Sequence, residues 1–207
     1  MNTNSIAGWG VALALALAST GCDQKKNPEV EQLKTRVAAL EKRLDKIEGP
    51  IQASAQQDER RKAMQESVNH RFQLDKKKYT QQQMTEIENL YQQVSKTKFG
   101  SPECLALVNK LAEQYPDSDR AGCAMLYLAQ GTDGPDAEKY FQACIQKFNG
   151  CFYGDGVQVG VLARFFLATY YHNNGLQDKA AALFQEIKDK YPDAVDHGGQ
   201  LLVDQIK

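Results

Sequence analysis

The stretch VGVLARFFLATYYHNNGLQDKAAALFQEIKDKYPDA, residues 159–194, decides the fold. Apolar residues recur in it at helical spacing on both sides of Gly175. Ala168 and Ala180 are small enough to let two helices approach closely, and Gly175 supplies the turn between them. Pro192 ends the second helix. The stretch therefore predicts an antiparallel helical hairpin.

This hairpin resembles the tetratricopeptide repeat (TPR), a helix–turn–helix unit of about 34 residues. The resemblance rests on six residues at mutual spacings of 3, 4, 5, 4 and 8, which are Ala168, Tyr171, Gly175, Ala180, Phe184 and Pro192. It implies that Tyr171 and Phe184 fill the space beside the close helix contact. Arg164 and Ile187 depart from the family pattern, since a large apolar and a small residue are usual there. Asp155 and Gln158 predict an N-cap with a capping box for the first helix.

A single repeat cannot bury its apolar face, and about three are needed for stability. Residues 119–148 predict a second hairpin, in which Ala137, Phe141 and Cys144 keep the small–aromatic–small order. Residues 101–118 pair with a helix expected near 81–95, and residues 198–207 predict a terminal capping helix. The predicted fold class is all-α, an N-terminal coiled-coil helix followed by a C-terminal TPR-like helical-hairpin solenoid over residues 80–207.

Residues 28–48, PEVEQLKTRVAALEKRLDKIE, carry a seven-residue apolar repeat that predicts a parallel coiled coil. The three flanking charge pairs expected between neighbouring chains all attract, and they are Glu29–Lys34, Arg36–Glu41 and Arg43–Glu48. The pattern RVAALE resembles that of short trimeric coiled coils, which favours a homotrimer over a dimer. A single amphipathic surface helix is the alternative, and Gly49-Pro50 predicts the helix end. The predicted seam is Val30, Leu33, Val37, Leu40, Leu44 and Ile47.

Residues 49–79 are polar and predict a spacer that is partly helical, with Met64, Val68 and Phe72 on a weak apolar stripe. At the other end of the chain, the apolar run Val11–Ala18 is too short to cross a bilayer and predicts a cleaved signal peptide over residues 1–21. Ser19, Thr20 and Gly21 lead directly into Cys22.

This order resembles a bacterial lipobox, which implies a lipid on Cys22, a tether over residues 22–27 and a periplasm-facing place in the cell envelope. Ser19 stands where Leu is commonest, and MNTNSIAGWG lacks Lys and Arg. An ordinary cleaved signal is the alternative, and the inner and outer membranes both stay open. Lipidated TPR chains with a coiled coil resemble the Tol–Pal-associated cell-division coordinators and the outer-membrane assembly lipoproteins.

The sequence carries no pattern of a catalytic, cofactor or metal site. There is no C-x-x-C, no HExxH and no P-loop, and the net charge of −1 gives no nucleic-acid footprint. Cys104, Cys123, Cys144 and Cys151 could pair as disulfides in an oxidising compartment or pack as small apolar residues. We therefore expect no enzyme activity, no cofactor and no bound metal.

The TPR resemblance implies that the first helix of each hairpin lines a groove for a partner protein or peptide. The residues that the family pattern places there are Leu162, Phe165, Thr169, His172 and Asn173 in the last hairpin, and Asp119, Leu126, Ala129 and Gln130 in the preceding one. Packing against a neighbouring helix is the alternative for the apolar members. The expected function is a membrane-anchored envelope scaffold, with a structural envelope spacer and an unrecognised hydrolase as alternatives.

Overall fold

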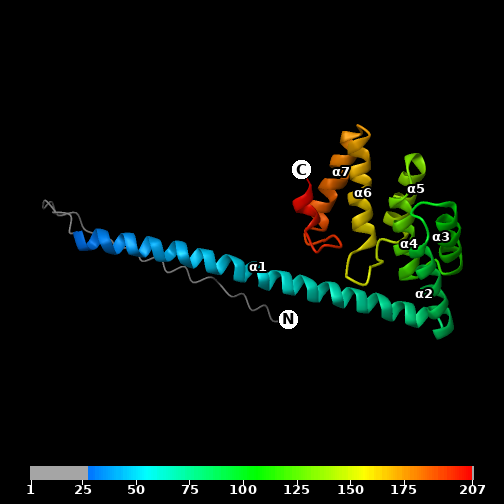
Figure 1. Cartoon of the computed structure of the whole chain (residues 1–207), viewed down its shortest axis with the longest axis horizontal. Coiled ribbons are helices and arrows are strands. Elements are labelled where there is room, and N and C mark those ends of the chain that lie inside the picture. Colours follow the sequence, from blue (N-terminus) through cyan, green and yellow to red (C-terminus); the bar gives the residue numbers. More distant parts are fainter. Residues whose placement is uncertain (1–27, 207) are drawn as a thin grey trace. The chain divides into compact units, whose positions relative to one another are not determined.

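A computed structural model describes residues 28–206, so the predictions for the signal peptide, Cys22 and the tether lie outside the described residues. The chain divides into two compact units, Met1–Ile51 and Gln52–Lys207. The described residues are helical throughout apart from turns and two isolated β-bridges, which confirms the all-α class (Figure 1). The elements are α1 (Pro28–Lys78), α2 (Gln81–Lys96), α3 (Pro102–Gln114), α4 (Asp119–Gln130), α5 (Gly134–Lys147), α6 (Val159–Asn173), α7 (Gln177–Lys190) and the 3₁₀ turn η1 (Leu202–Gln205).

The part of α1 in the first unit presents its apolar seam to solvent. The six predicted seam residues are 45% to 60% exposed. Ile51, one heptad after Leu44, is 61% exposed and extends the same seam. None of the described helices is both long enough and apolar enough to span a membrane.

The predicted helix end at Gly49-Pro50 is wrong, because α1 continues to Lys78. A proline inside a helix removes one backbone hydrogen bond and kinks the helix, but it does not always end it. The residues that follow are rich in Ala, Gln, Glu, Arg and Lys, which favour helix over the whole spacer segment.

Helices α2 to α7 form three helical pairs in the second unit, where the sequence predicts them (Figure 1). Local signals set their starts: Thr80 caps α2 through a capping box with Gln83, and the Ser101 side chain accepts a hydrogen bond from the Cys104 N–H at the start of α3. Buried apolar side chains, including Leu111, Leu126 and Leu167, run through all three pairs as one core.

Arg164 shows how an unusual residue fits the third pair. It is 8% exposed, and its Nη1 donates to Asn149 Oδ1 at 2.6 Å and to the Gly160 carbonyl at 2.9 Å. Its Nε lies 3.2 Å from a carboxylate oxygen of Glu186 on α7. The charged group thus joins the end of α5 to α6 and α7, where the family pattern has an apolar contact.

Two connections carry the same inserted loop, 43 residues apart. We call residues 151–159 the first hairpin loop and residues 194–202 the second hairpin loop. Each contains one antiparallel β-bridge, Phe152 with Gln158 and Val195 with Leu201. Each also contains a glycine with positive φ, at Gly156 and Gly199. The helices before them, α5 and α7, both have 14 residues, so helix and loop repeat as a unit.

The repeated loop corrects two local predictions. Asp155 does not cap α6, since the N-cap is Gln158 and Asp155 lies in the first hairpin loop, where it accepts from the Val157 N–H. The expected terminal helix is reduced to the short turn η1, whose Leu202 is buried in the place that Val159 takes at the start of α6.

Candidate functional site

One face of α6 presents a small surface patch of mixed polarity. His172 and Asn173 are exposed at the end of the helix. Thr169 is half-buried and its hydroxyl donates to the Phe165 carbonyl at 2.9 Å. Phe165 is also half-buried, with its ring 6.0 Å from the ring of Phe184. We call these four residues, Phe165, Thr169, His172 and Asn173, the α6 patch.

The other predicted groove residues are less accessible. Leu162 is 2% exposed, and Leu126 and Ala129 are fully buried, so these three belong to the core. Asp119 is held by internal contacts, and Gln130 is half-buried at the end of α4. The prediction of an open groove along α4 is therefore wrong.

The first hairpin loop covers the start of α4. A methyl group added to Gly122 would meet Cys151 at 2.7 Å, which shows how closely the loop approaches the helix. The Tyr153 hydroxyl donates to the Cys123 carbonyl at 3.0 Å, and the Cys123 thiol donates to the Phe152 carbonyl at 3.4 Å. The inserted loop thus occupies the part of the α4 surface near Asp119, Gly122 and Cys123.

The second half of α1 contacts the start of α4 through buried charged groups. Asp75 is 5% exposed, and it accepts a hydrogen bond from the Asp119 N–H at 2.9 Å. Arg71 Nη2 lies 3.4 Å from Asp75 Oδ1, and Arg71 Nε lies 3.6 Å from Asp119 Oδ1. Arg71 also donates a hydrogen bond to the Asp117 carbonyl. Asp119 in turn accepts from the Phe152 N–H at 2.6 Å. Three side chains therefore connect α1, α4 and the first hairpin loop.

Burial shifts the titration of both carboxylates in this cluster. It raises the pKa of Asp119 to about 6, against the opposing effects of the Phe152 N–H and Arg71. Burial also raises the pKa of Asp75, and the Asp119 N–H and Arg71 oppose that rise. The hydrogen bond that each carboxylate accepts from a backbone N–H thus favours its ionised form and offsets part of the effect of burial.

The buried face of the second half of α1 differs from the predicted apolar stripe of Met64, Val68 and Phe72. Met64 packs against the core and Val68 is half-buried, as an apolar stripe requires. Phe72 is 47% exposed, with the Lys76 ammonium 5.0 Å from its ring centroid. Its neighbour Arg71 faces the solenoid instead. The sequence pattern does not predict this orientation of Arg71, because charged residues mark the solvent side of most helices.

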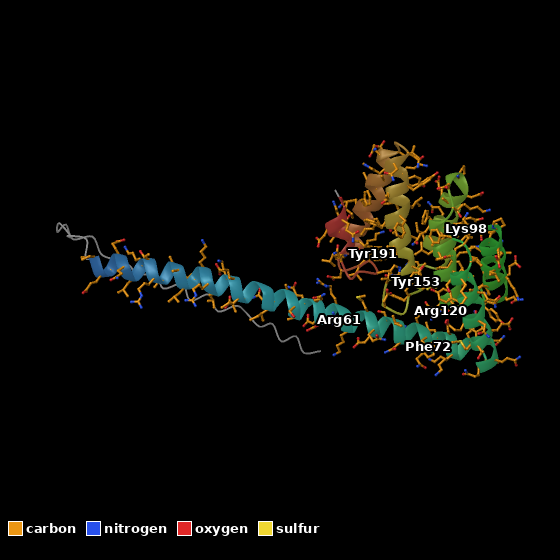
Figure 2. The ribbon with its side chains drawn as sticks, in the orientation of Figure 1. Arg61, Phe72, Lys98, Arg120, Tyr153 and Tyr191 are labelled. Atoms are coloured by element: carbon orange, nitrogen blue, oxygen red, sulfur yellow. The ribbon has the colours of Figure 1, made fainter. Side chains whose placement is uncertain are left out.

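A cavity of about 540 Å³ lies between α1, the second hairpin loop and the start of α6. Its apolar walls include Met64, Phe152, Val161, Tyr191 and Val195. Its charged lining residues are Glu59, Arg60, Lys190 and Asp193. Arg60 also lines a smaller neighbouring cavity with Arg61 and His197. In Figure 2, Tyr153 and Tyr191 lie on the side of the solenoid that faces the α1 segment with Arg61. No sequence motif marks this cavity.

The ionisable groups near the loops form no catalytic arrangement that we can identify in the described residues. His197 Nδ1 lies 2.8 Å from Asp155 Oδ2, and both side chains are about half exposed. All four cysteines of the described part are free and buried. Burial raises the pKa of Cys123 and Cys144, and raises that of Cys151 to about 12, so these three thiols stay protonated and are poor nucleophiles. The described residues contain no group of His, Cys, Asp and Glu suited to a metal.

Comparison with known proteins supports the fold of the last hairpin. Residues 163–194 match the family model described as a tetratricopeptide repeat. This segment contains most of α6 and all of α7, and it includes the α6 patch. No curated protein and no solved structure matches the chain. The chain thus contains a TPR, a kind of repeat that generally binds other proteins.

Proposed function

We propose that this protein is a non-enzymatic scaffold of the bacterial cell envelope that binds a partner protein through the α6 patch. The observation that carries the proposal is the α6 patch itself. It lies on the first helix of the matched repeat, where exposed His172 and Asn173 follow the half-buried ring of Phe165 about two turns later on the same face. An aromatic anchor beside polar groups suits recognition of a peptide or helix.

The exposed seam of α1 supports assembly into a homo-oligomer. Seven apolar residues at heptad spacing, from Val30 to Ile51, are each 45% or more exposed in a single chain. Exposed apolar residues in one continuous stripe indicate an interaction site. A parallel trimer buries the stripe and brings the three attractive charge pairs of residues 29–48 together. Lipid on Cys22 would hold the assembly at a membrane and raise its effective concentration.

The test replaces Phe165 and His172 by Ala in the full chain and measures recovery of envelope proteins by affinity purification. We expect the double variant to lose a partner that the wild type recovers, while its circular dichroism stays that of a folded helical chain. Lys188→Ala, at an exposed position on α7, is the matched control. Unchanged recovery by the double variant would reject the site.

A structural spacer is the second candidate function, and the length of α1 favours it. Helix α1 has 51 residues, whereas the average helix of a globular protein has about 11–12. Under this alternative the helix alone carries the function. Deletion of residues 80–207 should then leave the envelope intact, whereas the scaffold proposal expects the deletion to give the same defect as loss of the protein.

A further inference from the structure

The two hairpin loops place the same backbone groups in different surroundings. Phe152 and Val195 each belong to the non-hydrogen-bonded pair of an antiparallel bridge, because the bridging hydrogen bonds are made by the residues on either side of them. The N–H and C=O of such a residue point away from the partner strand. In the first hairpin loop the Phe152 N–H donates to Asp119 at 2.6 Å, and the Phe152 carbonyl accepts from the Cys123 thiol. In the second hairpin loop the equivalent residue is Val195, and neither its N–H nor its carbonyl has a hydrogen-bond partner among the described residues.

The difference follows from two residues of the repeat, since Leu162 and Phe166 stand where the first repeat has Asp119 and Cys123. Position 162 is equivalent to position 119, since both lie 33 residues before the bridged residue of their loop. Leu162 stands there in place of Asp119, so the second loop has no carboxylate of its own. Val195 is only 8% exposed, and a buried backbone N–H without an acceptor is destabilising. An acceptor from another molecule would remove this cost.

Helix α1 places one arginine near each of the two hairpin loops. Arg71 lies 3.6 Å from the Asp119 carboxylate at the first loop. Arg60 precedes Arg71 by 11 residues, which is about three turns, so both side chains leave the same face of α1. Arg60 is half-buried, lines the cavity beside Val195 and pairs with no acid among the described residues. The second site thus has the arginine and the N–H of the first but no carboxylate at the position of Asp119, although Glu59 and Asp193 also line the cavity.

We propose that the cavity beside Val195 binds a carboxylate carried by an extended peptide segment of the partner protein. The carboxylate takes the place of Asp119, between Arg60 and the Val195 N–H. A peptide fits better than a fatty acid, because its own N–H can donate to the Val195 carbonyl. The apolar walls formed by Met64, Val161 and Tyr191 accommodate an aliphatic neighbour of the acidic residue. The inference rests on the proposed function in taking a protein as the ligand.

The test uses the ¹⁵N-labelled chain and two probe peptides, acetyl-Leu-Asp-Leu-amide and its Asn counterpart, at about 5 mM, a concentration suited to weak binding. We expect the Asp peptide to shift the Val195 amide proton downfield and to slow its exchange. The Asn peptide should bind at least about fivefold more weakly, since it carries no charge for Arg60. An unperturbed Val195 amide, or equal binding of both peptides, would overturn the inference.

Two variants separate the proposed contacts from a general charge effect. Arg60→Gln should weaken the Asp peptide about tenfold, a change of about 1.4 kcal/mol. Lys62→Gln, which removes the same charge from an exposed position of α1, should leave binding unchanged. Equal loss in both variants would contradict a site at Arg60. Sodium octanoate serves as the third probe, and a Val195 response to octanoate equal to that of the Asp peptide would overturn the choice of a peptide.

A carboxylate placed within the chain gives an independent readout. Leu162→Asp should slow exchange of the Val195 amide without any peptide and should abolish binding of the Asp peptide. Binding that persists in a folded Leu162→Asp chain would contradict the equivalence of the two sites, and the Arg60 arm decides if this variant does not fold. Loss of the partner on changing the α6 patch concerns the proposed function alone, so the two proposals can fail separately.

Discussion

Asp119 joins three parts of the molecule through a single carboxylate. Its backbone N–H donates to Asp75 on α1, and its side chain accepts from Phe152 and lies near Arg71. The family pattern places the residue in a binding groove, because a sequence shows which side of a helix a residue takes but not what covers that side. The covering segment, the first hairpin loop, is an insertion between two predicted helices.

Removing Asp75 should destabilise the fold by about 2–4 kcal/mol, because Arg71 would lose a buried partner and the Asp119 N–H would lose its acceptor. The measurement is urea unfolding of the wild type and of Asp75→Ala, monitored by far-ultraviolet circular dichroism. Asp58→Ala removes an exposed ion pair with Arg61 on the same helix and should cost no more than about 1 kcal/mol. Equal losses would mean that the cluster contributes no more than a surface pair.

Asp119 should also make stability depend on pH. Its pKa is raised to about 6 from an ordinary value of 3.8, so the folded chain holds a proton that the unfolded chain releases between these values. The contribution to the free energy of unfolding is therefore full below about pH 4 and is lost as pH rises through 6, by up to about 3 kcal/mol.

Unfolding curves measured from pH 4 to pH 7 for the wild type and Asp119→Asn test this dependence. The Asn side chain keeps an oxygen that can accept from Phe152, but it cannot titrate. The stability of the variant should fall less than that of the wild type over this range. Parallel profiles for the two proteins would contradict the assignment of the slope to Asp119.

At the scale of elements, the sequence predicts helices well and connections poorly. Alanine and aromatic spacing predicts α4 to α7, since close helix packing requires small residues at fixed positions. The bridge Phe152–Gln158 escapes prediction because its loop has too few residues for strand alternation. The loop segments FYGDG (residues 152–156) and VDHGG (residues 195–199) have only their final glycine in common, so the sequence does not reveal that the loop is repeated. The continuation of α1 beyond Pro50 escapes because one unfavourable residue is outweighed by many favourable ones.

The two loop glycines provide a matched test of the contact between α1 and the solenoid. An alanine at Gly156 would place its Cβ 2.6 Å from Met64, whereas an alanine at Gly199 would meet nothing within 4 Å. Both positions have positive φ and share the backbone cost of roughly 1 kcal/mol. Gly156→Ala should therefore destabilise by about 1–3 kcal/mol more than Gly199→Ala in thermal unfolding.

The same contact predicts the effect of a second change. Met64→Ala should recover part of the extra loss in Gly156→Ala, because the smaller side chain leaves room for the new methyl group, and should recover none in Gly199→Ala. Additive effects of Met64→Ala and Gly156→Ala would show that α1 does not press on the first hairpin loop.

At the scale of the whole molecule, the sequence supplies the modular order, helix first and repeats afterwards. It does not show that residues 52–78 belong to the same compact unit as the repeats, because their contacts depend on charged side chains such as Arg71 that ordinarily face water. The α6 patch is predictable from the family pattern, since it lies on the last hairpin, where the resemblance is strongest. The cavity beside Val195 becomes recognisable only when the two loops are compared in three dimensions.

Assembly through the seam should be separable from folding of the solenoid. Leu40→Lys places a charge in the middle of the seam and should convert a trimer into monomers in sedimentation velocity at micromolar concentration. Lys42→Ala, at an exposed position outside the seam, should leave the trimer intact. A wild type that sediments as a monomer would contradict the coiled coil, and a persistent trimer in Leu40→Lys would move the interface elsewhere.

Protein binding at the α6 patch can be tested by photo-crosslinking in the cell from an unnatural amino acid at position 165, compared with the same group at position 188. Protein binding at the α6 patch predicts one defined crosslinked protein from position 165, lost when His172 is also changed to Ala, and no such product from position 188. The same products from both positions, or none from position 165 in a folded chain, would contradict it.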